Sequence, residues 1–576
     1  MGVPGLWSFF KEFGESISLA KLACDHYYKD NRVPKGFRIG IDLLIWSYQM
    51  RSSHGGQNPE LRTLFFRLCR LGYLGILPIF VLDGSKRPLF KRNRKVPKAI
   101  FGLSQVIDLI RLFGFPIWYA PGEAEAECAL LLKKSIIDAV MSTDVDSFIF
   151  GAQKVISDWS VDDESKTSTL SHVSIFDIET VMKKSNISQA GMLLIALISS
   201  GDYDSTGIPN CGIKTAISAA KAGFGDTLLS LIKNRLDLTS WKKDLEKYLS
   251  TNHGGHFSTR HSFLKLPEDF PNQDIIQFYI NPVVSTDLEL KRKLRHVVWK
   301  WPINVPKLQK FVSIHFSWSD LPGIKRFVRS FAPCYLVSSL KHTDFSKHAE
   351  INCSQKSNSM KKINSTYFTN IKEHLKNIEN KDEENGIKIL CYRKHVSTGY
   401  SLEFRISFCP FKLINIDFTS GKQSNKNDIE LNDKNVSNFT QITNKEIDLN
   451  EKMEIWILDP YLKDFEKHDI IEWKSKTKNN TFKKKLGYDQ LGAIESYLLA
   501  PSKNRSILGS LELNQNSLKK QNIIPHSLSL NSTSSLTQKT QISQTYKIKT
   551  ISKSQSSIPS NSSLIQSTLS TLTQNL

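Results

Sequence analysis

The sequence lacks the features that mark secreted, zinc-binding and membrane-spanning proteins. Its eight cysteines are scattered over 576 residues and none belongs to a Cys-x-x-Cys pair, so neither a disulfide framework nor a cysteine-rich zinc site is expected. The longest apolar stretches, Leu74 to Leu82 and Met192 to Ile198, are well short of the roughly 18 residues that a membrane span needs. We therefore expect a soluble protein with reduced thiols and no membrane partner.

Acidic residues are outnumbered by basic ones. The chain has 77 Lys and Arg against 56 Asp and Glu, which gives a formal net charge of +21. An excess of this size favours a polyanionic partner such as nucleic acid or an anionic membrane. Charge alone does not choose between them, so the choice depends on the motifs that the chain carries.

The C-terminal segment has little that could form a core. The 76 residues from Pro501 hold 27 Ser or Thr, eight Lys or Arg and one acid, Glu512, a composition that predicts disorder. Ser-Pro and Thr-Pro dipeptides are absent from the whole chain. We therefore expect that proline-directed kinases find no preferred site here.

Between residue 37 and about 205, short apolar runs alternate with longer helical patterns, which predicts a parallel sheet flanked by helices. The fold class is thus expected to be α/β. The chain is long enough for two or three folded units. The predicted strands are Phe37 to Ile41, Ile76 to Leu82, Pro116 to Tyr119, Ala139 to Met141 and Val155 to Ile156.

The second half is expected to add a helical extension, a linker, a small α+β unit and a basic, disordered tail. Core anchors of the extension are predicted to be Trp299, Trp301, Phe316 and Trp318. The small unit has β-like runs at Ile387 to Tyr392 and Ser401 to Phe408, a polar insert at about 419–450, and strand and helix character from Met453 to Trp473. The predicted boundaries are 1–98 and 99–225 for the α/β unit, 226–345 for the extension, 346–384 for the linker, 385–475 for the small unit and 476–576 for the tail.

Acidic residues stand at or just after several predicted strand ends. Asp42 ends the first strand, Asp83 follows the second, and Asp144 and Asp146 follow Val140-Met141. The carboxyl edge of a parallel sheet is where such folds place active sites. If the chain is still extended at Asp144 and Asp146, both side chains project to the same side.

Two further acidic blocks complete the set. In Pro121-Gly122-Glu123-Ala124-Glu125-Ala126-Glu127 a loop leads into a helix, where regular geometry would pair Glu123 with Glu127. Gly201-Asp202-Tyr203-Asp204 closes an apolar helix. A lone acid is more often a helix cap or a solvated turn. A whole set at one edge, however, would repel itself unless divalent cations neutralised it.

Oxygen ligands without His or Cys are those that Mg²⁺ or Mn²⁺ prefers. This is the composition of a two-metal phosphodiesterase site, whose ions lie about 3.5 to 4 Å apart.

The sequence resembles the flap endonuclease and XPG superfamily. Six blocks occur in the superfamily's order: Gly2-Val3-Pro4-Gly5-Leu6-Trp7, Ile41-Asp42, Val81-Leu82-Asp83-Gly84, Ala120 to Ala126, Asp144-Val145-Asp146 and Gly201-Asp202-Tyr203. Within it the chain is most similar to fungal members of the Holliday junction resolvase branch, through residue 345 and in patches to 475. The resemblance implies a PIN-like nuclease core of an N-terminal region (1–98) and an internal region (99–225), with a helix-two-turn-helix element from about 200 and a chromodomain-like unit at 385–475.

The resemblance also implies the residues of the site. Glu123 would precede regular helix, so that Glu125 rather than Glu127 completes the set; Glu127 would lie at the surface or behind the ligands. Two Mg²⁺ ions, replaceable by Mn²⁺, would activate a water for in-line attack on phosphorus. The implied catalytic, metal-binding residues are Asp42, Asp83, Glu123, Glu125, Asp144, Asp146 and Asp202.

DNA contacts are expected at two further places besides the N-terminus and the chromodomain-like unit, which the resemblance implies would extend DNA contact. The segment from Lys86 to Lys98 is dense in basic residues, which neutralise phosphates, unless it is only a solvated helix face. The stretch from Gly207 to Ala216 resembles the hairpin that grips duplex backbone and binds K⁺, although a plain turn is an alternative. The implied DNA-binding residues are Gly2, Lys91, Arg92, Arg94, Gly207, Gly212, Lys214 and Thr215.

The implied function is cleavage of four-way junctions by symmetric nicks, and also of 5′ flaps and related branched DNA, in DNA repair and recombination. The implied compartment is the nucleus. The absence of a long heptad repeat favours a monomer in solution that dimerises on junction DNA. Two alternatives stay open: an enzyme specialised for 5′ flaps, and a catalytically silent DNA-binding protein on the same fold.

Overall fold

A computed structural model describes residues 2–462 apart from 33, 89, 92–93, 96–101, 162–169, 253–263, 300–302, 350–386, 415–447 and 449. All described residues belong to one compact unit. Arg92, Trp301, Trp473, most of the linker, most of the polar insert and the tail predicted at 476–576 lie outside them. No helix in this part of the chain is both long and apolar enough to cross a membrane. Its seven cysteines form no disulfide, as expected.

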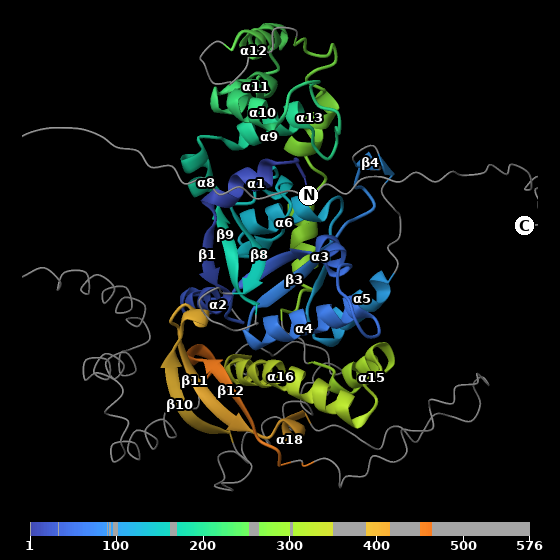
Figure 1. The fold of residues 1–576 in the computed structure, drawn as a ribbon, viewed down its shortest axis with the longest axis vertical. Coiled ribbons are helices and arrows are strands. Elements are labelled where there is room, and N and C mark those ends of the chain that lie inside the picture. Colours follow the sequence, from blue (N-terminus) through green and yellow to red (C-terminus); the bar gives the residue numbers. More distant parts are fainter. Residues whose placement is uncertain are drawn as a thin grey trace, which may run out of the picture. The chain divides into compact units, whose positions relative to one another are not determined.

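A seven-stranded sheet in the order β1-β9-β8-β7-β2-β3-β6 forms the centre of the molecule (Figure 1). Strands β8, β7, β2, β3 and β6 run parallel to one another. Strand β9 pairs antiparallel with β8, and β1 pairs antiparallel with β9. Each central strand is buried on both faces, which explains the continuous apolar runs. The strands are β1 (Glu15–Ser18), β2 (Arg38–Asp42), β3 (Leu77–Leu82), β6 (Ile117–Tyr119), β7 (Ala139–Met141), β8 (Lys154–Val161) and β9 (Leu170–Asp177).

Helices separate most of the parallel strands, as the alternating pattern predicted, whereas β8 leads into β9. The strands β1 and β9 were not predicted, because their sequences are rich in Ser and lack a continuous apolar run. The helices of this part are α1 (Leu6–Phe10), α2 (Leu19–Lys29), α3 (Leu43–Met50), α4 (Pro59–Tyr73), α5 (Leu103–Leu112), α6 (Ala124–Lys133), α7 (Asp146–Ile149), α8 (Ile178–Ser185) and α9 (Gln189–Ser199), with a 3-10 turn, η1 (Lys11–Phe13). A short hairpin, β4 (Phe90–Lys91) and β5 (Arg94–Lys95), follows β3.

The chain after α9 is mainly helical, and α9 to α13 lie together beyond one end of the sheet (Figure 1). Phe316 and Trp318 are buried as predicted. Trp299 is only partly buried, with its ring under the Arg38 guanidinium. The helices are α10 (Ile213–Lys221), α11 (Phe224–Lys233), α12 (Thr239–Thr251), α13 (Gln273–Ile280), α14 (Asp287–Leu294), α15 (Val305–Phe316) and α16 (Leu321–Ala349).

A small unit of three antiparallel strands packs against α4 and α16. Its elements are β10 (Lys388–Lys394), β11 (Leu402–Phe408), β12 (Met453–Leu458), α18 (Pro410–Ile414) and the 3-10 turns η2 (Val396–Thr398) and η5 (Asp459–Tyr461). The Tyr461 hydroxyl donates to the Leu74 carbonyl at 2.6 Å, and Tyr73 donates to the Trp456 carbonyl. Buried Lys341 on α16 donates to the Gly75 carbonyl at 2.6 Å. Polar bonds thus fasten this unit to the end of α4, and α16 to the loop that follows α4.

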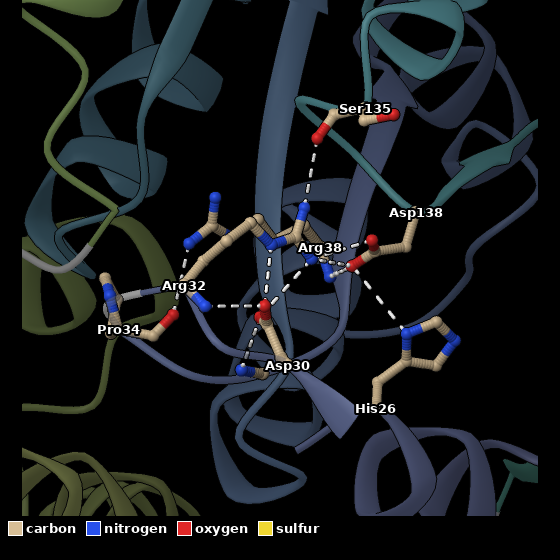
Figure 2. Close-up of polar contacts among 8 residues, drawn as sticks. His26, Asp30, Arg32, Pro34, Arg38, Ser135 and Asp138 are labelled. Carbon is tan, nitrogen blue, oxygen red and sulfur yellow. Dashed lines mark hydrogen bonds and ion pairs between the residues drawn. The ribbon is translucent and has the colours of Figure 1, made fainter. Parts of the chain in front are cut away.

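At the amino end of β2 and β7, an ion-pair network fixes how the two strands begin (Figure 2). The Asp138 carboxylate accepts from the Arg32 guanidinium at 2.7 and 2.8 Å and from the Arg38 amide at 2.8 Å. Arg32 also donates to Asp30 at 2.7 Å. Because Asp138 stands directly before β7 and Arg38 begins β2, the network sets the register of the strands whose far ends carry Asp42 and Asp144.

Replacing Asp138 with Asn is expected to lower the free energy of unfolding by about 1–3 kcal/mol, because the Arg32 guanidinium and the Arg38 amide lose a charged acceptor. Urea denaturation followed by tryptophan fluorescence measures this. The matched control is Asp25→Asn, which removes an exposed pair with Lys21 and should change stability by less than about 0.5 kcal/mol. Equal effects of the two substitutions would show that the network does not stabilise the sheet.

Candidate active site

The carboxyl ends of β2 and β3 each place an aspartate where a helix begins. Asp42 is the N-cap of α3, and its Oδ1 accepts from the amides of Leu44 at 2.8 Å and Ile45 at 3.1 Å. Asp83 lies just beyond β3, and its Oδ1 accepts from the Ala124 amide at 2.8 Å. Asp83 therefore ties the edge of the sheet to the start of α6.

Two glycines allow the loops of Asp83 and Glu123 to approach each other. The Gly84 amide donates to the Gly122 carbonyl at 2.7 Å. A Cβ on Gly84 would collide with the backbone of Ala120 and Pro121, and a Cβ on Gly122 would collide with the Val283 carbonyl. Only glycine fits these close contacts.

Glu123 and Glu125 enter the site from the start of α6. Glu123 is the N-cap of this helix and has extended backbone angles, so the expectation that it precedes regular helix is confirmed. Glu125 lies in the first turn, and both side chains are buried. The Tyr203 hydroxyl donates to Glu123. Sequence reasoning did not single out Tyr203, although it directly follows Asp202 in the last acidic block.

Asp144 and Asp146 come together through a turn. The Asp146 amide donates to Asp144 Oδ1 at 3.0 Å, and α7 begins at Asp146. The chain is therefore not extended here, and the expectation based on an extended chain was wrong. The turn brings the two acids together, rather than the alternation of side chains along a strand. Gly2 packs so closely against both carboxylates that a Cβ would collide with them. The N-terminal block is thus part of the wall of this site.

Lys91, at the end of β4, contacts three acids from two segments, the start of α6 and the loop after α9. Its ammonium contacts Glu123, Glu125 at 3.2 Å and Asp202 at 3.5 Å. Burial alone would lower the pKa of Lys91, but the carboxylates of Glu125 and Glu123 raise it well above its ordinary value. The lysine is therefore a cation held by the acidic centre. Arg94 belongs to β5, and its side chain is outside the described part of the chain, as is Arg92.

The buried acids of the site oppose one another's ionisation. Burial and the nearby Asp83 raise the pKa of Asp42 to about 7. Burial also raises the pKa of Glu125, Asp144 and Asp146, and Asp144 raises those of Glu125 and Asp146 further. Ionising all of them at neutral pH requires positive charge in addition to Lys91.

The donor set suits hard divalent cations. The seven acids predicted from the sequence supply carboxylate oxygens, and two of these oxygens, Asp144 Oδ2 and Asp146 Oδ1, are buried without a hydrogen-bond partner. Within the described residues, no three acidic, His or Cys side chains converge on one point as a preformed metal cage; instead the Lys91 ammonium lies among them. The residue types and the unpartnered oxygens fit Mg²⁺ or Mn²⁺.

Glu127 has a structural role that the sequence did not reveal. It is fully buried, so of the two positions expected for Glu127, at the surface or behind the ligands, the structure excludes the surface. It accepts from Trp118 Nε1 at 2.7 Å, from the Ser285 amide at 2.8 Å and from the Ser285 hydroxyl at 2.5 Å. Glu127 thus fastens α6, which carries Glu125, to β6 and to the segment before α14. Its partners are distant in sequence, so no local pattern could have identified them.

The predicted DNA-binding hairpin is the loop between α9 and α10. Gly207 has φ +60°, and a Cβ there would collide with the Ile198 carbonyl. Gly212 is the N-cap of α10 with open space around it. Lys214 is exposed, whereas Thr215 is buried. The backbone amides at the start of α10 and Lys214 therefore face solvent, where an anion could approach them.

Comparisons with known proteins agree with this geometry. The XPG N-terminal domain matches residues 1–98 and the XPG I-region matches residues 114–202. The mouse protein "Flap endonuclease GEN homolog 1" is 26% identical over 252 residues, which are 40% of this chain and 26% of that protein. The Arabidopsis thaliana protein "Flap endonuclease GEN-like 1" is 27% identical over 225 residues, 34% of this chain and 37% of the relative. The chain thus spans about a quarter to a third of the length of these relatives.

Solved structures match over a larger share of the chain. A "eukaryotic junction-resolving enzyme GEN-1 binding with Potassium" is 33% identical with a TM-score of 0.62, and the match covers 83% of this chain and 100% of the other. A "Holliday junction-resolving enzyme GEN1 (WT) in complex with product DNA, Mg2+ and Mn2+ ions" is 32% identical with a TM-score of 0.61 and the same coverage.

The raised pKa values predict how stability depends on pH. Folding raises the pKa of Asp42 from 3.8 to about 7. Protonation of Asp42 therefore stabilises the folded state; this stabilisation is complete below pH 3.8 and is lost as the pH rises through 7. The metal-free protein should therefore melt at a lower temperature at pH 8 than at pH 5, and Mg²⁺ should raise the melting temperature more at pH 8. Thermal unfolding in EDTA and in Mg²⁺ measures both.

The matched variant is Asp42→Asn with Asp144→Asn, which should lose most of the Mg²⁺ effect at pH 8. Equal stabilisation by Mg²⁺ at both pH values, or in the variant, would contradict a metal site built from these acids.

Proposed function

Because this chain belongs to the flap endonuclease and XPG superfamily, in the branch of the GEN junction-resolving enzymes, we propose that it is a structure-selective endonuclease that hydrolyses phosphodiester bonds in branched DNA. One observation carries the proposal. All seven acids implied by the superfamily pattern are present, and the loops and helix starts at one edge of the sheet carry them. A silent DNA-binding protein would have no need to keep such mutually repelling carboxylates.

Each part of the site has a role in this reaction. Two Mg²⁺ ions, when bound, supply Lewis-acid activation of a water and stabilise the charge that develops on the phosphate. Asp42, Asp83, Glu123, Glu125, Asp144, Asp146 and Asp202 would hold them. Lys91, on the hairpin after β3, would supply a positive charge for the phosphate, and the Tyr203 hydroxyl would orient Glu123. No side chain is required as a nucleophile, and the products are 5′-phosphate and 3′-hydroxyl ends.

Duplex DNA would be held away from the acids by the hairpin between α9 and α10. The open backbone at Gly212 and the exposed Lys214 suit a phosphate of the duplex, and the carbonyls of the tight turn at Gly207 suit K⁺. The three-stranded unit (β10 to β12) falls within residues 385–475, for which the sequence implied a chromodomain-like unit, and we propose that it extends the contact. We further propose the nucleus as the compartment of this reaction.

The preferred substrate is proposed to be the four-way junction, with 5′ flaps also cut. The match to junction-resolving structures, over 83% of this chain and the whole of theirs, supports this choice. Single-turnover rates on an intact junction and on a 5′ flap separate it from the flap-specialised alternative. Efficient cutting of flaps alone would favour that alternative.

Glu125→Gln or Asp144→Asn should remove cutting but retain junction binding, because the acids perform chemistry while basic surface supplies most of the affinity. Removing a residue that only hydrogen-bonds to a metal ligand typically lowers metal affinity or activity about 10–100-fold. Loss of a ligand itself should therefore slow cleavage at least about a hundredfold. Rates in gels and affinities by fluorescence anisotropy test this. Glu179→Gln, an exposed change on α8, is the control. Normal turnover by either site variant would refute the assignment.

Resolution of a junction is proposed to need two copies of the chain, which are monomers when free. A single two-metal site fits one scissile phosphate, and the two-fold symmetry of the junction can bring a second copy to the opposing strand. A plasmid that extrudes a cruciform should therefore give mainly linear product at saturating enzyme. Independent nicking would instead accumulate nicked circles, because a nicked plasmid reabsorbs its cruciform. Mainly nicked circles, or a stable dimer at low concentration in sedimentation, would contradict the proposal.

A further inference from the structure

A pocket outside the acidic centre lies along β6, the strand at one edge of the large sheet. Its volume is about 470 Å³, which is within the range of small-ligand sites. Residues of β6 and the loop before it form one wall, and residues 293–298, at and after the end of α14, form the other. None of these residues belongs to the seven acids or to the residues proposed to hold the duplex.

The charge on the pocket has one sign. Arg111, Lys293 and His296 are the basic residues of its lining, and no Asp or Glu lines it. Arg111 and His296 are exposed, whereas the Lys293 ammonium is held by the Tyr119 carbonyl at 2.7 Å and the Ser285 hydroxyl at 2.8 Å. The lining therefore suits an anion that approaches Arg111 and His296 from solvent.

The pocket also offers one aromatic face. Tyr119 is 51% exposed, and its hydroxyl lies 3.5 Å from the Arg111 guanidinium. The neighbouring Trp118 is buried, with Lys293 over its ring at 5.1 Å, so it supports the wall and does not offer a stacking surface. Apolar Ile117, Val297 and Val298 complete the lining. A planar, anionic ligand matches this combination.

The pocket is rigidly connected to the acidic centre. Tyr119 is four residues before Glu123 in the chain. Behind the pocket, Trp118 and Ser285 both donate to Glu127 on α6, the helix that also carries Glu125. A strand that passes the acidic centre could therefore reach the pocket within a short distance.

We propose that this pocket is an accessory site for one nucleotide of an unpaired DNA strand that leaves the branch point, with the base stacked on Tyr119 and its phosphate beside Arg111 and His296. Stacking on an aromatic side chain is the usual way of holding an unpaired base, and cations track its backbone. A peptide strand added to β6 fits less well, because Lys293 already occupies the Tyr119 carbonyl that such a ladder would use. The inference rests on the proposed function for its choice of DNA.

The test compares two full-length variants on two DNA probes by fluorescence anisotropy, without divalent cation so that no cleavage occurs. The probes are a nicked duplex and the same duplex with a short single-stranded 5′ flap. The site variant is Arg111→Gln with Tyr119→Leu, and the control is Lys184→Gln, which removes an exposed charge on α8. Free dAMP is added as a competitor to distinguish a nucleotide in a strand from a free nucleotide.

The wild type and the control should bind the flapped probe about tenfold more tightly than the nicked duplex. The site variant should lose this preference while its affinity for the nicked duplex stays within about twofold. Equal weakening on both probes would overturn the proposal in favour of a general DNA surface, and an unchanged flap preference would overturn it outright. Competition by dAMP at micromolar concentration would indicate a site for free nucleotides and would also overturn it.

The readout is independent of cleavage. If the wild type shows no nuclease activity but keeps a flap preference that Arg111→Gln with Tyr119→Leu removes, the proposed function fails and the pocket assignment stands. If cleavage is normal and the preference is absent, the pocket assignment alone fails.

Discussion

Repulsion among buried carboxylates is the constraint on which the rest of this structure depends. Asp42, Glu125, Asp144 and Asp146 are buried at one edge of the sheet, and burial together with neighbouring acids raises the pKa of each. The Lys91 ammonium offsets part of this charge but cannot balance seven acids. The fold must therefore hold the acids in place until divalent cations bind, and the same need for cations makes the edge suited to phosphodiester chemistry.

Polar contacts away from the acids supply that rigidity. At the amino end of the sheet, Asp138 and Arg32 fix the start of the strands that end in the acidic cluster. Behind α6, Glu127 fastens the catalytic helix to β6 and to the chain before α14. Close-packed glycines at the loops then bring the carboxylates together. Hydrogen bonds, ion pairs and backbone packing around the acidic cluster thus hold its carboxylates in place against their mutual repulsion.

Sequence patterns were sufficient for the elements whose signal is local. The five parallel strands were predicted because each contains a short apolar run, although of β8 only Val155 and Ile156 were included. Six ordered blocks located the acids. The resemblance correctly placed Glu123 before regular helix, although helical spacing would have paired it with Glu127. The local turn at Asp144 was missed. Features that depend on distant partners were missed too: β1 and β9, which have no continuous apolar run, the burial of Glu127 against Ser285, and the insertion of Lys91 among the acids. These depend on which segments the fold brings together, which no window of sequence contains.

The central claim is that seven carboxylates act as one centre for two metal ions. Electron paramagnetic resonance of Mn²⁺ bound to the protein with product DNA tests it most directly, because ions about 3.5–4 Å apart interact magnetically. The account predicts two Mn²⁺ per chain with the spectrum of a coupled pair, reduced to at most one uncoupled ion in Asp144→Asn. No bound Mn²⁺, or two uncoupled ions in the wild-type protein, would contradict it.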